Sequence, residues 1–185
     1  MTKIYLLRHA QSQASANQDT SLAPDSPLSP FGQRQAQHIV PALKALSLDA
    51  VWCSPFLRAE QTISTFLSDS EIKAQVIPAL AEGQLLLDAT ISAAASRFGP
   101  EAMPAVDERP EEFIARIDGV IKSLHSQSNK RLLLVSHDHT IRALLNRIIQ
   151  PSCIVRFPHQ NCGLSAVTIH PELCIEFINR PLCSD

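Results

Sequence analysis

The sequence predicts an α/β fold, a three-layer α/β/α sandwich in which a mostly parallel central sheet carries helices on both faces. Short apolar runs alternate with longer amphipathic stretches in the order β-α-β-α-β-α-α-β-α-β-β, as crossover-connected parallel strands require. The most apolar run, residues 131–135, does not alternate with polar residues, which is typical of a central strand buried on both faces. With 185 residues and 45% hydrophobic content, the chain is expected to form one domain over residues 1–185.

Composition argues against several classes of function. A net charge of −2 provides no basic surface, so no nucleic-acid partner is expected. No apolar run approaches the length of a membrane span, and the run before Arg8 is too short for a signal peptide, so a cytoplasmic protein without membrane contact is expected. The five cysteines form no C-x-x-C pair and predict reduced, mostly buried thiols. Their spacing to histidines matches no metal-ligand set, so neither a metal nor another cofactor is expected.

The first third of the chain predicts a strand, a long loop and a divided helix. Residues 4–7 form an apolar strand that ends at Arg8 and His9. The polar loop over residues 11–30 follows this strand end and is expected to wall a pocket there. Ser29 and Pro30 then suit the N-cap and first position of a helix, which Pro41 should kink or divide.

The middle of the chain repeats this order of strand and helix. Residues 49–53 predict a strand, and the helix after it carries Arg58 near its start. A cation is unfavourable at a helix N-terminus, so either a bound anion compensates it or Arg58 is a solvated surface residue. Residues 75–77 predict a third strand, whose following loop carries Glu82, and residues 88–98 predict an Ala-rich helix.

The last third contains the most buried predicted strand and a terminal strand pair. A helix with acidic residues in its first turn begins at Pro110, and its apolar face extends to Leu124. The strand at residues 131–135 leads to His137 and to another helix. Residues 164–170 and 174–178 alternate in polarity and predict an antiparallel pair.

Because the carboxyl ends of parallel strands meet at one edge of a sheet, these junctions should form one pocket. The side chains concerned are Arg8, His9, Arg58, Glu82 and His137. Guanidinium groups bind phosphate oxygens, and a neutral imidazole is a nucleophile whose pKa two nearby guanidiniums should lower. A second imidazole can stabilise charge, and a carboxyl group can protonate a leaving oxygen. The set therefore indicates phosphoryl transfer.

Five segments at these junctions resemble the histidine phosphatase superfamily, in its phosphoglycerate-mutase-like branch 1. The segments occur in the family's order and span nearly the whole chain, at residues 7–12, 28–36, 54–62, 80–82 and 135–145. The resemblance implies that His9 accepts the phosphoryl group and that Arg8, Arg58 and His137 bind it. It also implies that Glu82 is the proton donor and that no metal is needed.

Four positions depart from the family pattern. Ala10 stands where glycine is usual, and Ser15 stands where a phosphate-binding asparagine is usual, with Asn17 two residues later. Asp138 and His139 replace a frequent Gly-Gly pair, and a distant branch uses an aspartate at the position of Asp138 as its acid. Asp138 is therefore a rival to Glu82, which is favoured because the other motifs match branch 1. The candidate substrate contacts beside the arginines and His137 are Ser12, Ser15, Asn17 and Asp138.

The predicted function is a phosphomonoesterase that hydrolyses a small phosphorylated substrate through a phosphohistidine on His9. One alternative is a phosphohistidine phosphatase acting on a phosphoprotein of a phosphorelay, against which Glu82 argues. Another is a phosphoglycerate-mutase-type phosphotransferase, for whose inserted lid 185 residues leave little room. A third is a binding module without catalysis, against which the intact set argues. The sequence specifies neither the substrate nor the oligomeric state.

Overall fold

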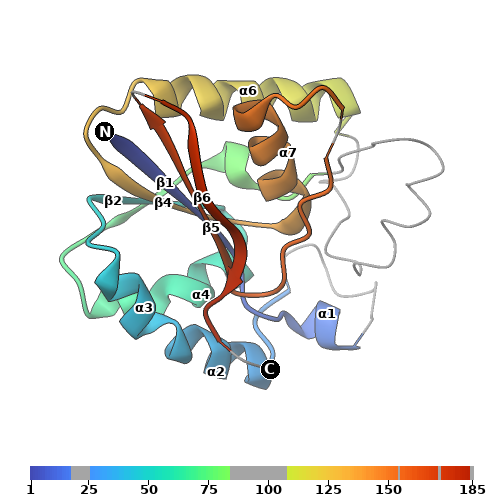
Figure 1. Ribbon diagram of the computed structural model, residues 1–185. Coiled ribbons are helices and arrows are strands. Elements are labelled where there is room, and N and C mark those ends of the chain that lie inside the picture. The colour runs from blue at the N-terminus through green and yellow to red at the C-terminus, as the bar shows by residue number, and fades with distance from the viewer. Residues whose placement is uncertain (18–25, 84–107, 154, 171, 184–185) are drawn as a thin grey trace.

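A six-stranded sheet forms the centre of the molecule in the computed structural model, which describes residues 1–17, 26–83, 108–153, 155–170 and 172–183 (Figure 1). The strand order is β3-β2-β4-β1-β5-β6. The first four of these are mutually parallel, and β5 runs antiparallel to both of its neighbours. The strands are β1 (Thr2–Arg8), β2 (Ala50–Cys53), β3 (Ala74–Val76), β4 (Arg131–Ser136), β5 (Gly163–His170) and β6 (Cys174–Pro181). The predicted α/β class and the mostly parallel sheet are confirmed.

The central position of β4 sets the level at which the neighbouring strands end. Leu132 to Val135 are completely buried, as the unbroken apolar run predicts. Val135 lies beside Leu7 of β1 on one side and beside Cys53 of β2 on the other. The residues after these three positions therefore leave the sheet at the same edge, which is where the predicted functional side chains lie.

Helices cover both faces of the sheet, and Figure 1 shows α6 and α7 on one side and α2, α3 and α4 on the other. Alternate residues of β1 enter two different cores: Tyr5 and Leu7 pack with α2–α4, whereas Ile4 and Leu6 pack with α6 and α7. The helices are α2 (Pro30–His38), α3 (Val40–Ala45), α4 (Leu57–Ser68), α6 (Pro110–His125) and α7 (Asp138–Ile149). The three-layer arrangement is thus as predicted.

The start of α2 holds the backbone that follows β1. Ser29 caps the helix, its hydroxyl accepting a hydrogen bond from the Gly32 N–H at 3.0 Å, and Pro30 occupies the first turn. A Cβ atom on Gly32 would lie 2.0 Å from the Gln11 carbonyl oxygen, so only glycine permits this approach. The chain breaks between α2 and α3 at Ile39, as the proline at position 41 predicts.

Four expectations from the sequence require correction or completion. The loop after β1 contains a short helix, α1 (Gln13–Asn17), and the predicted helix at 88–98 lies outside the described residues. Glu82 does not follow β3 directly, because a 3₁₀ helix, η1 (Pro78–Leu80), intervenes. The expectation of mostly buried thiols is wrong: Cys53 and Cys162 are buried, but the other three are not.

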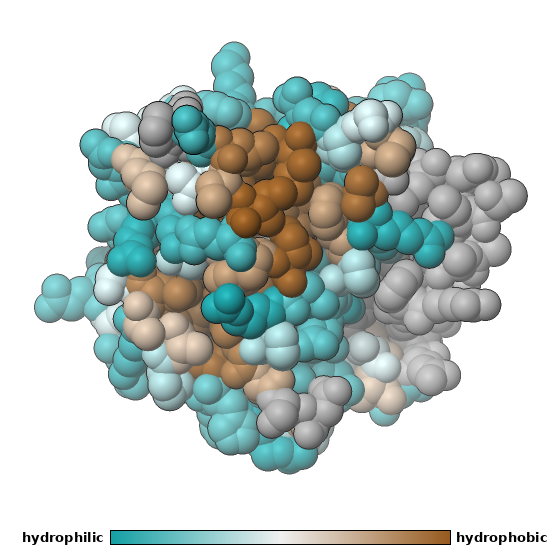
Figure 2. All heavy atoms as spheres, in the orientation of Figure 1, coloured by the Kyte–Doolittle hydropathy of each residue, from teal (hydrophilic) through white to brown (hydrophobic). Residues whose placement is uncertain are grey.

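The edge strand β6 is only partly covered. In Figure 2 hydrophobic residues gather on the face over β5, β6 and the adjoining α7. Ile175 is 43% exposed, and Ile169 and Ile178 are only partly buried. None of the described helices is both long enough and apolar enough to cross a membrane.

Candidate active site

His9 lies at the end of β1 with its backbone and its ring both fixed. Its N–H continues the sheet by donating to the Ser136 carbonyl at 3.0 Å, and its carbonyl accepts from the Asn161 side-chain amide at 3.0 Å. The ring Nδ1–H donates to the Ala10 carbonyl at 2.7 Å. This contact places the proton of the neutral ring on Nδ1 and leaves the lone pair on Nε2.

His137 faces His9 across the same edge, with the two ring centroids 5.0 Å apart. Its Nε2 lies 2.7 Å from the Ser54 hydroxyl, and its Nδ1 has no hydrogen-bond partner among the described residues, although the side chain is completely buried. Burial lowers the pKa of His137 well below its usual value, and the charge of Arg58 lowers it further. His137 is therefore a neutral imidazole with one unused polar atom.

Both predicted arginines are buried close to this histidine pair. Arg58 is only 1% exposed, and its Nε–H donates to His9 Nε2 at 3.3 Å, which confirms burial rather than a surface position. Its guanidinium stacks on the Phe56 ring at 4.8 Å, and that ring meets His137 edge-on. Arg8 is 7% exposed and donates from Nη1 to the His159 carbonyl at 2.5 Å.

Glu82 reaches the cluster from the segment after η1. Its carboxylate oxygen accepts from the backbone N–H of Gly83 at 3.1 Å and from the N–H and hydroxyl of Thr140, each at 3.2 Å. Burial raises the pKa of Glu82 to about 7, and the neighbouring Asp138 charge adds to this. Arg58, the Gly83 N–H and Arg8 oppose the rise. Glu82 can therefore hold or release a proton near neutral pH.

Asp138, the rival carboxylate, is buried but engaged with other groups. One oxygen accepts from the His159 N–H at 3.1 Å, and the other pairs with Arg142 Nη1 at 3.3 Å. Both partners are themselves buried. Asp138 is thus linked to Arg8 through the backbone of His159.

The three candidate substrate contacts after β1 differ in position. Ser12 is completely buried, and its hydroxyl accepts from the Ser15 N–H at 3.1 Å at the start of α1. Ser15 is half-buried. Asn17 ends α1 and is exposed, so the structure does not gather it with the buried cluster.

Several residues that support the site were not singled out from the sequence. Thr62 accepts from the Ala10 N–H at 2.9 Å and so fixes the backbone beyond His9. Arg116 donates to the carbonyls of Ala79, Ala81 and Glu82 and holds the segment that carries Glu82. For Ser54 and Thr140 a signal existed, because each is a polar residue close to a strand end. Thr62 and Arg116 act from helix interiors and carry no such signal.

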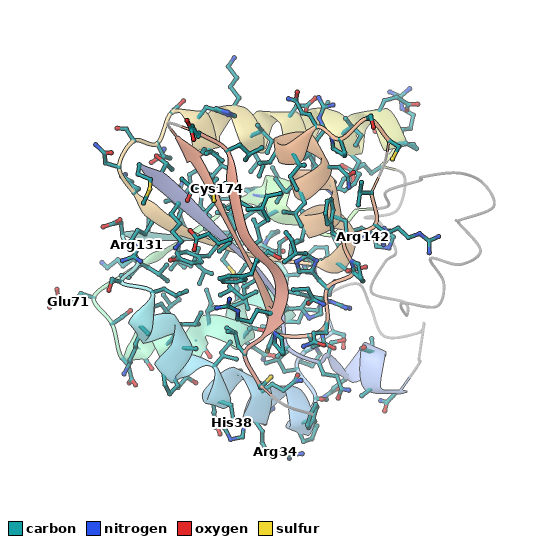
Figure 3. All side chains as sticks on the ribbon, viewed as in Figure 1. Arg34, His38, Glu71, Arg131, Arg142 and Cys174 are labelled. Atoms are coloured by element: carbon teal, nitrogen blue, oxygen red, sulfur yellow. The ribbon has the colours of Figure 1, made fainter. Side chains whose placement is uncertain are left out.

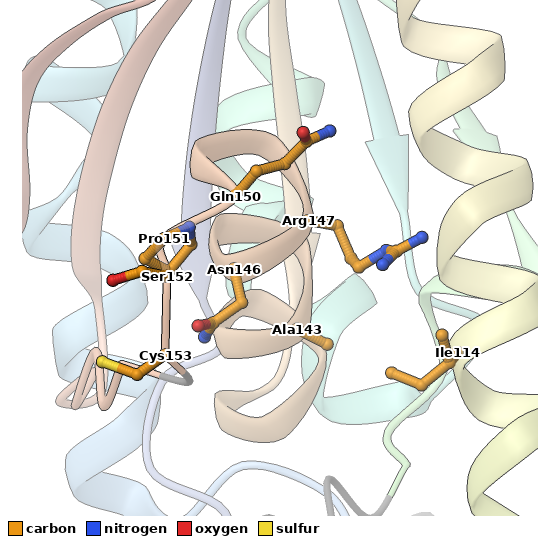
Figure 4. Close-up of a pocket in the computed structure, with 8 residues that line it drawn as sticks. All are labelled: Ile114, Ala143, Asn146, Arg147, Gln150, Pro151, Ser152 and Cys153. Atoms are coloured by element: carbon orange, nitrogen blue, oxygen red, sulfur yellow. The ribbon is translucent and has the colours of Figure 1, made fainter.

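A separate hollow of about 590 Å³ lies between α6 and α7 (Figure 4). Its lining includes Ile114, Ala143, Arg147 and Cys153. None of the residues that line it belongs to the histidine cluster. In the described part of the chain, no three side chains of the types that bind metals are grouped to hold an ion.

Two imidazoles and two guanidiniums at the carboxyl edge of a mostly parallel sheet define a class of phosphate-handling sites. The family model of the histidine phosphatase superfamily (branch 1) matches residues 4–176, and the chain belongs to this family. The chain is 29% identical over 160 residues to adenosylcobalamin/alpha-ribazole phosphatase of Escherichia coli K12, covering 80% of this chain and 79% of the relative. It is 28% identical over 155 residues to the uncharacterized phosphatase PhoE of Bacillus subtilis 168, covering 80% and 78%.

The solved structures agree with the sequence relatives. A putative alpha-ribazole-5′-P phosphatase from E. coli superposes with a TM-score of 0.78 at 26% identity, covering 100% of this chain and 99% of the other. The protein is accordingly a phosphatase, a hydrolase of a superfamily that works without a metal ion.

Proposed function

We propose that the protein hydrolyses a phosphate monoester through a phosphohistidine formed on His9. The observation that carries this proposal is the fixed tautomer of His9, whose Nδ1–H is bound to the Ala10 carbonyl. Its Nε2 lone pair therefore faces the Arg58 guanidinium, where a phosphoryl group would be held.

In the first step, Nε2 of His9 attacks phosphorus while the bond from phosphorus to the ester oxygen breaks. Arg8 and Arg58 offset the charge on the phosphoryl oxygens. His137 contributes as a neutral hydrogen-bond donor. If its Nε2 accepts the Ser54 hydroxyl proton, its own proton is on Nδ1, the buried atom without a protein partner among the described residues. That N–H is then available to a phosphoryl oxygen.

The departing oxygen takes its proton from Glu82. A pKa of about 7 supports this role, because the carboxyl group is then protonated below neutral pH and can still release its proton. In the second step the Glu82 carboxylate accepts a proton from water as the water oxygen attacks phosphorus. The bond from His9 to phosphorus breaks, inorganic phosphate leaves, and His9 and Glu82 return to their starting states.

Asp138 is less suited to the acid role than Glu82. Its two oxygens already accept from the His159 N–H and from Arg142. These contacts support Glu82 as the proton donor.

The relatives suggest a substrate in which phosphate esterifies a ribose-type hydroxyl, since two of them are named for alpha-ribazole phosphate. The leaving group of such an ester is an alkoxide, which needs protonation as it departs. The presence of a buried carboxyl group with a raised pKa fits this requirement. We therefore propose alpha-ribazole 5′-phosphate as the first substrate to examine.

The test is a comparison of phosphate release from alpha-ribazole 5′-phosphate, 3-phosphoglycerate and p-nitrophenyl phosphate, each with EDTA present. The proposal expects release from the first and third, with the highest kcat/KM for the ribose ester. Release from none of the three, with phosphate still bound by the protein, would favour a binding module. Isomerisation of 3-phosphoglycerate without phosphate release would favour a mutase, and release only from a phosphohistidine protein would favour the phosphorelay alternative.

A further inference from the structure

We propose that Asp138 is a positioning residue that holds the guanidinium of Arg8 in place through the backbone of His159. The inference rests on the proposed function, in which Arg8 binds the phosphoryl group. It assigns to Asp138 a role that differs from both proton donation and substrate contact.

The connection runs through three buried residues. The Asp138 carboxylate accepts from the His159 N–H at 3.1 Å, and the His159 carbonyl accepts from Arg8 Nη1 at 2.5 Å. Asp138 is 2% exposed and His159 is 3% exposed, so water cannot readily replace these bonds. The position of the carbonyl that orients Arg8 therefore depends on the carboxylate on the other side of the same residue.

The side chain of His159 is fixed as firmly as its backbone. Its Nδ1–H donates to the Phe157 carbonyl at 2.9 Å, and its Nε2 accepts from the Ser165 hydroxyl at 2.6 Å. The Ser165 oxygen accepts in turn from the Asn179 N–H at 2.9 Å. Burial lowers the pKa of His159, in keeping with this neutral tautomer. The segment is thus anchored to β5 and β6. Asn146 of α7 holds its start at Val155, and the Asp138 bond links its end at His159 to α7.

The charge of Asp138 has a second consequence at the active site. Arg142, one turn along α7, pairs with the carboxylate, so the charge is stabilised in a buried place. Among the groups that act on Glu82, Asp138 on α7 raises its pKa, whereas Arg58 on α4 and Arg8 on β1 lower it. The Arg116 guanidinium on α6 contacts the Glu82 carbonyl. Loss of the Asp138 charge should therefore lower the pKa of Glu82.

Two substitutions separate the hydrogen bond from the charge. Asp138→Asn keeps an oxygen that can accept from the His159 N–H but removes the charge, whereas Asp138→Ala removes both. Asp118→Asn is the matched control, because this carboxylate pairs with Arg147 on the surface at 2.5 Å and lies outside the site. For each variant the measurements are the Kd for inorganic phosphate by calorimetry, the pH profile of kcat/KM on an alkyl phosphate, and the melting temperature.

The proposal expects Asp138→Ala to raise the Kd for phosphate roughly 10-fold, since a charge-assisted contact of Arg8 is loosened. Asp138→Asn should stay within about threefold of the wild type in Kd, because its hydrogen bond remains. In both variants the alkaline limb of the pH profile should move to lower pH, and Asp118→Asn should change neither quantity.

An unchanged Kd in Asp138→Ala, or an equal rise in both variants, would overturn the positioning role. Selective loss of alkyl over aryl phosphate hydrolysis in Asp138→Asn that persists at acidic pH, where Glu82 stays protonated, would overturn it differently, by making Asp138 the acid. The Kd for phosphate does not depend on turnover. A wild type that binds phosphate without hydrolysing any ester would therefore refute the proposed function and leave the positioning role testable.

Discussion

The substitution Glu82→Gln tests the site through both stability and rate. Gln retains an oxygen at the position that accepts from Gly83 and Thr140. In the wild type, burial and, next, the Asp138 charge raise the pKa of Glu82 from 4.5 to about 7, against the opposing effect of Arg58. The substitution therefore removes a buried carboxyl group that is costly to ionise while leaving its shape in place.

Proton linkage gives the sign and the size of the stability change that Glu82→Gln should cause. Between pH 4.5 and 7 the folded protein keeps the Glu82 proton while the unfolded chain releases it, so the free energy of unfolding falls as pH rises. Above pH 7, where Glu82 is ionised in the folded protein as well, its raised pKa lowers the free energy of unfolding by about 3 kcal/mol in total. Glu82→Gln should therefore be more stable than the wild type by up to about 3 kcal/mol at pH 8 and should show little difference at pH 4.

The rate should change in the opposite direction to the stability. Without a proton donor, hydrolysis of an alkyl phosphate should slow roughly 10²–10⁴-fold, whereas p-nitrophenyl phosphate, whose leaving group needs no proton, should be much less affected. Urea unfolding at pH 4 and pH 8 measures the first effect, and kcat on the two esters measures the second. Glu71→Gln is the control, because Glu71 projects into solvent far from the site (Figure 3). A variant that is less stable than the wild type at pH 8, or that slows both esters equally, would refute the reasoning.

Three further predictions follow from the geometry of the site. Arg58→Ala should raise KM and lower kcat together, with a loss in kcat/KM of roughly 10–100-fold, and steady-state kinetics with unchanged values would contradict its contact to the phosphoryl group. Ser54→Ala should lower kcat by roughly 10-fold or less, because the His137 ring loses one hydrogen bond, and an unchanged kcat would show that this bond is dispensable. Burial lowers the pKa of His137, and that of His139 to about 4, so the free energy of unfolding should fall as pH drops below 6.5. Urea unfolding of Glu82→Gln, which lacks the opposing titration, measures this directly, and a flat profile would contradict it.

The histidines and arginines could be predicted from the sequence because each follows directly from a strand or a helix start. An unbroken apolar run places β4 in the centre, and parallel neighbours then bring His9 and His137 to one edge. For Arg58 the unfavourable helix dipole left two interpretations, and its 1% exposure decides between them. These conclusions depend only on local pattern and general topology.

The roles of the carboxylates could not be predicted in the same way. Glu82 reaches the cluster only because η1 turns the chain and Arg116 holds the following carbonyls. Asp138 adjoins His137 in sequence, yet its contacts depend on His159, a residue in an irregular segment with no recognisable pattern. The choice between two acids depends on hydrogen-bond partners that are distant along the chain, and periodicity carries no information about these.

The exposure of the cysteines shows a similar limit. The odd number of cysteines and the lack of a C-x-x-C pair led to the expectation of buried thiols, but the side chains of Cys153 and Cys174 are exposed. Cys162, in contrast, is buried directly beside the site, and its N–H donates to the Arg8 carbonyl at 3.1 Å. Residue type alone cannot distinguish these environments.

The central claim is that His9 carries the phosphoryl group, and the most direct test is to trap that intermediate. Wild-type protein mixed with a ³²P-labelled phosphate ester and quenched within milliseconds should carry label that is labile to acid and stable to alkali. Peptide mapping should place the label on His9, and the His9→Ala variant should remain folded, carry no label and lose turnover. Label on a different residue, or turnover retained by His9→Ala, would contradict the account.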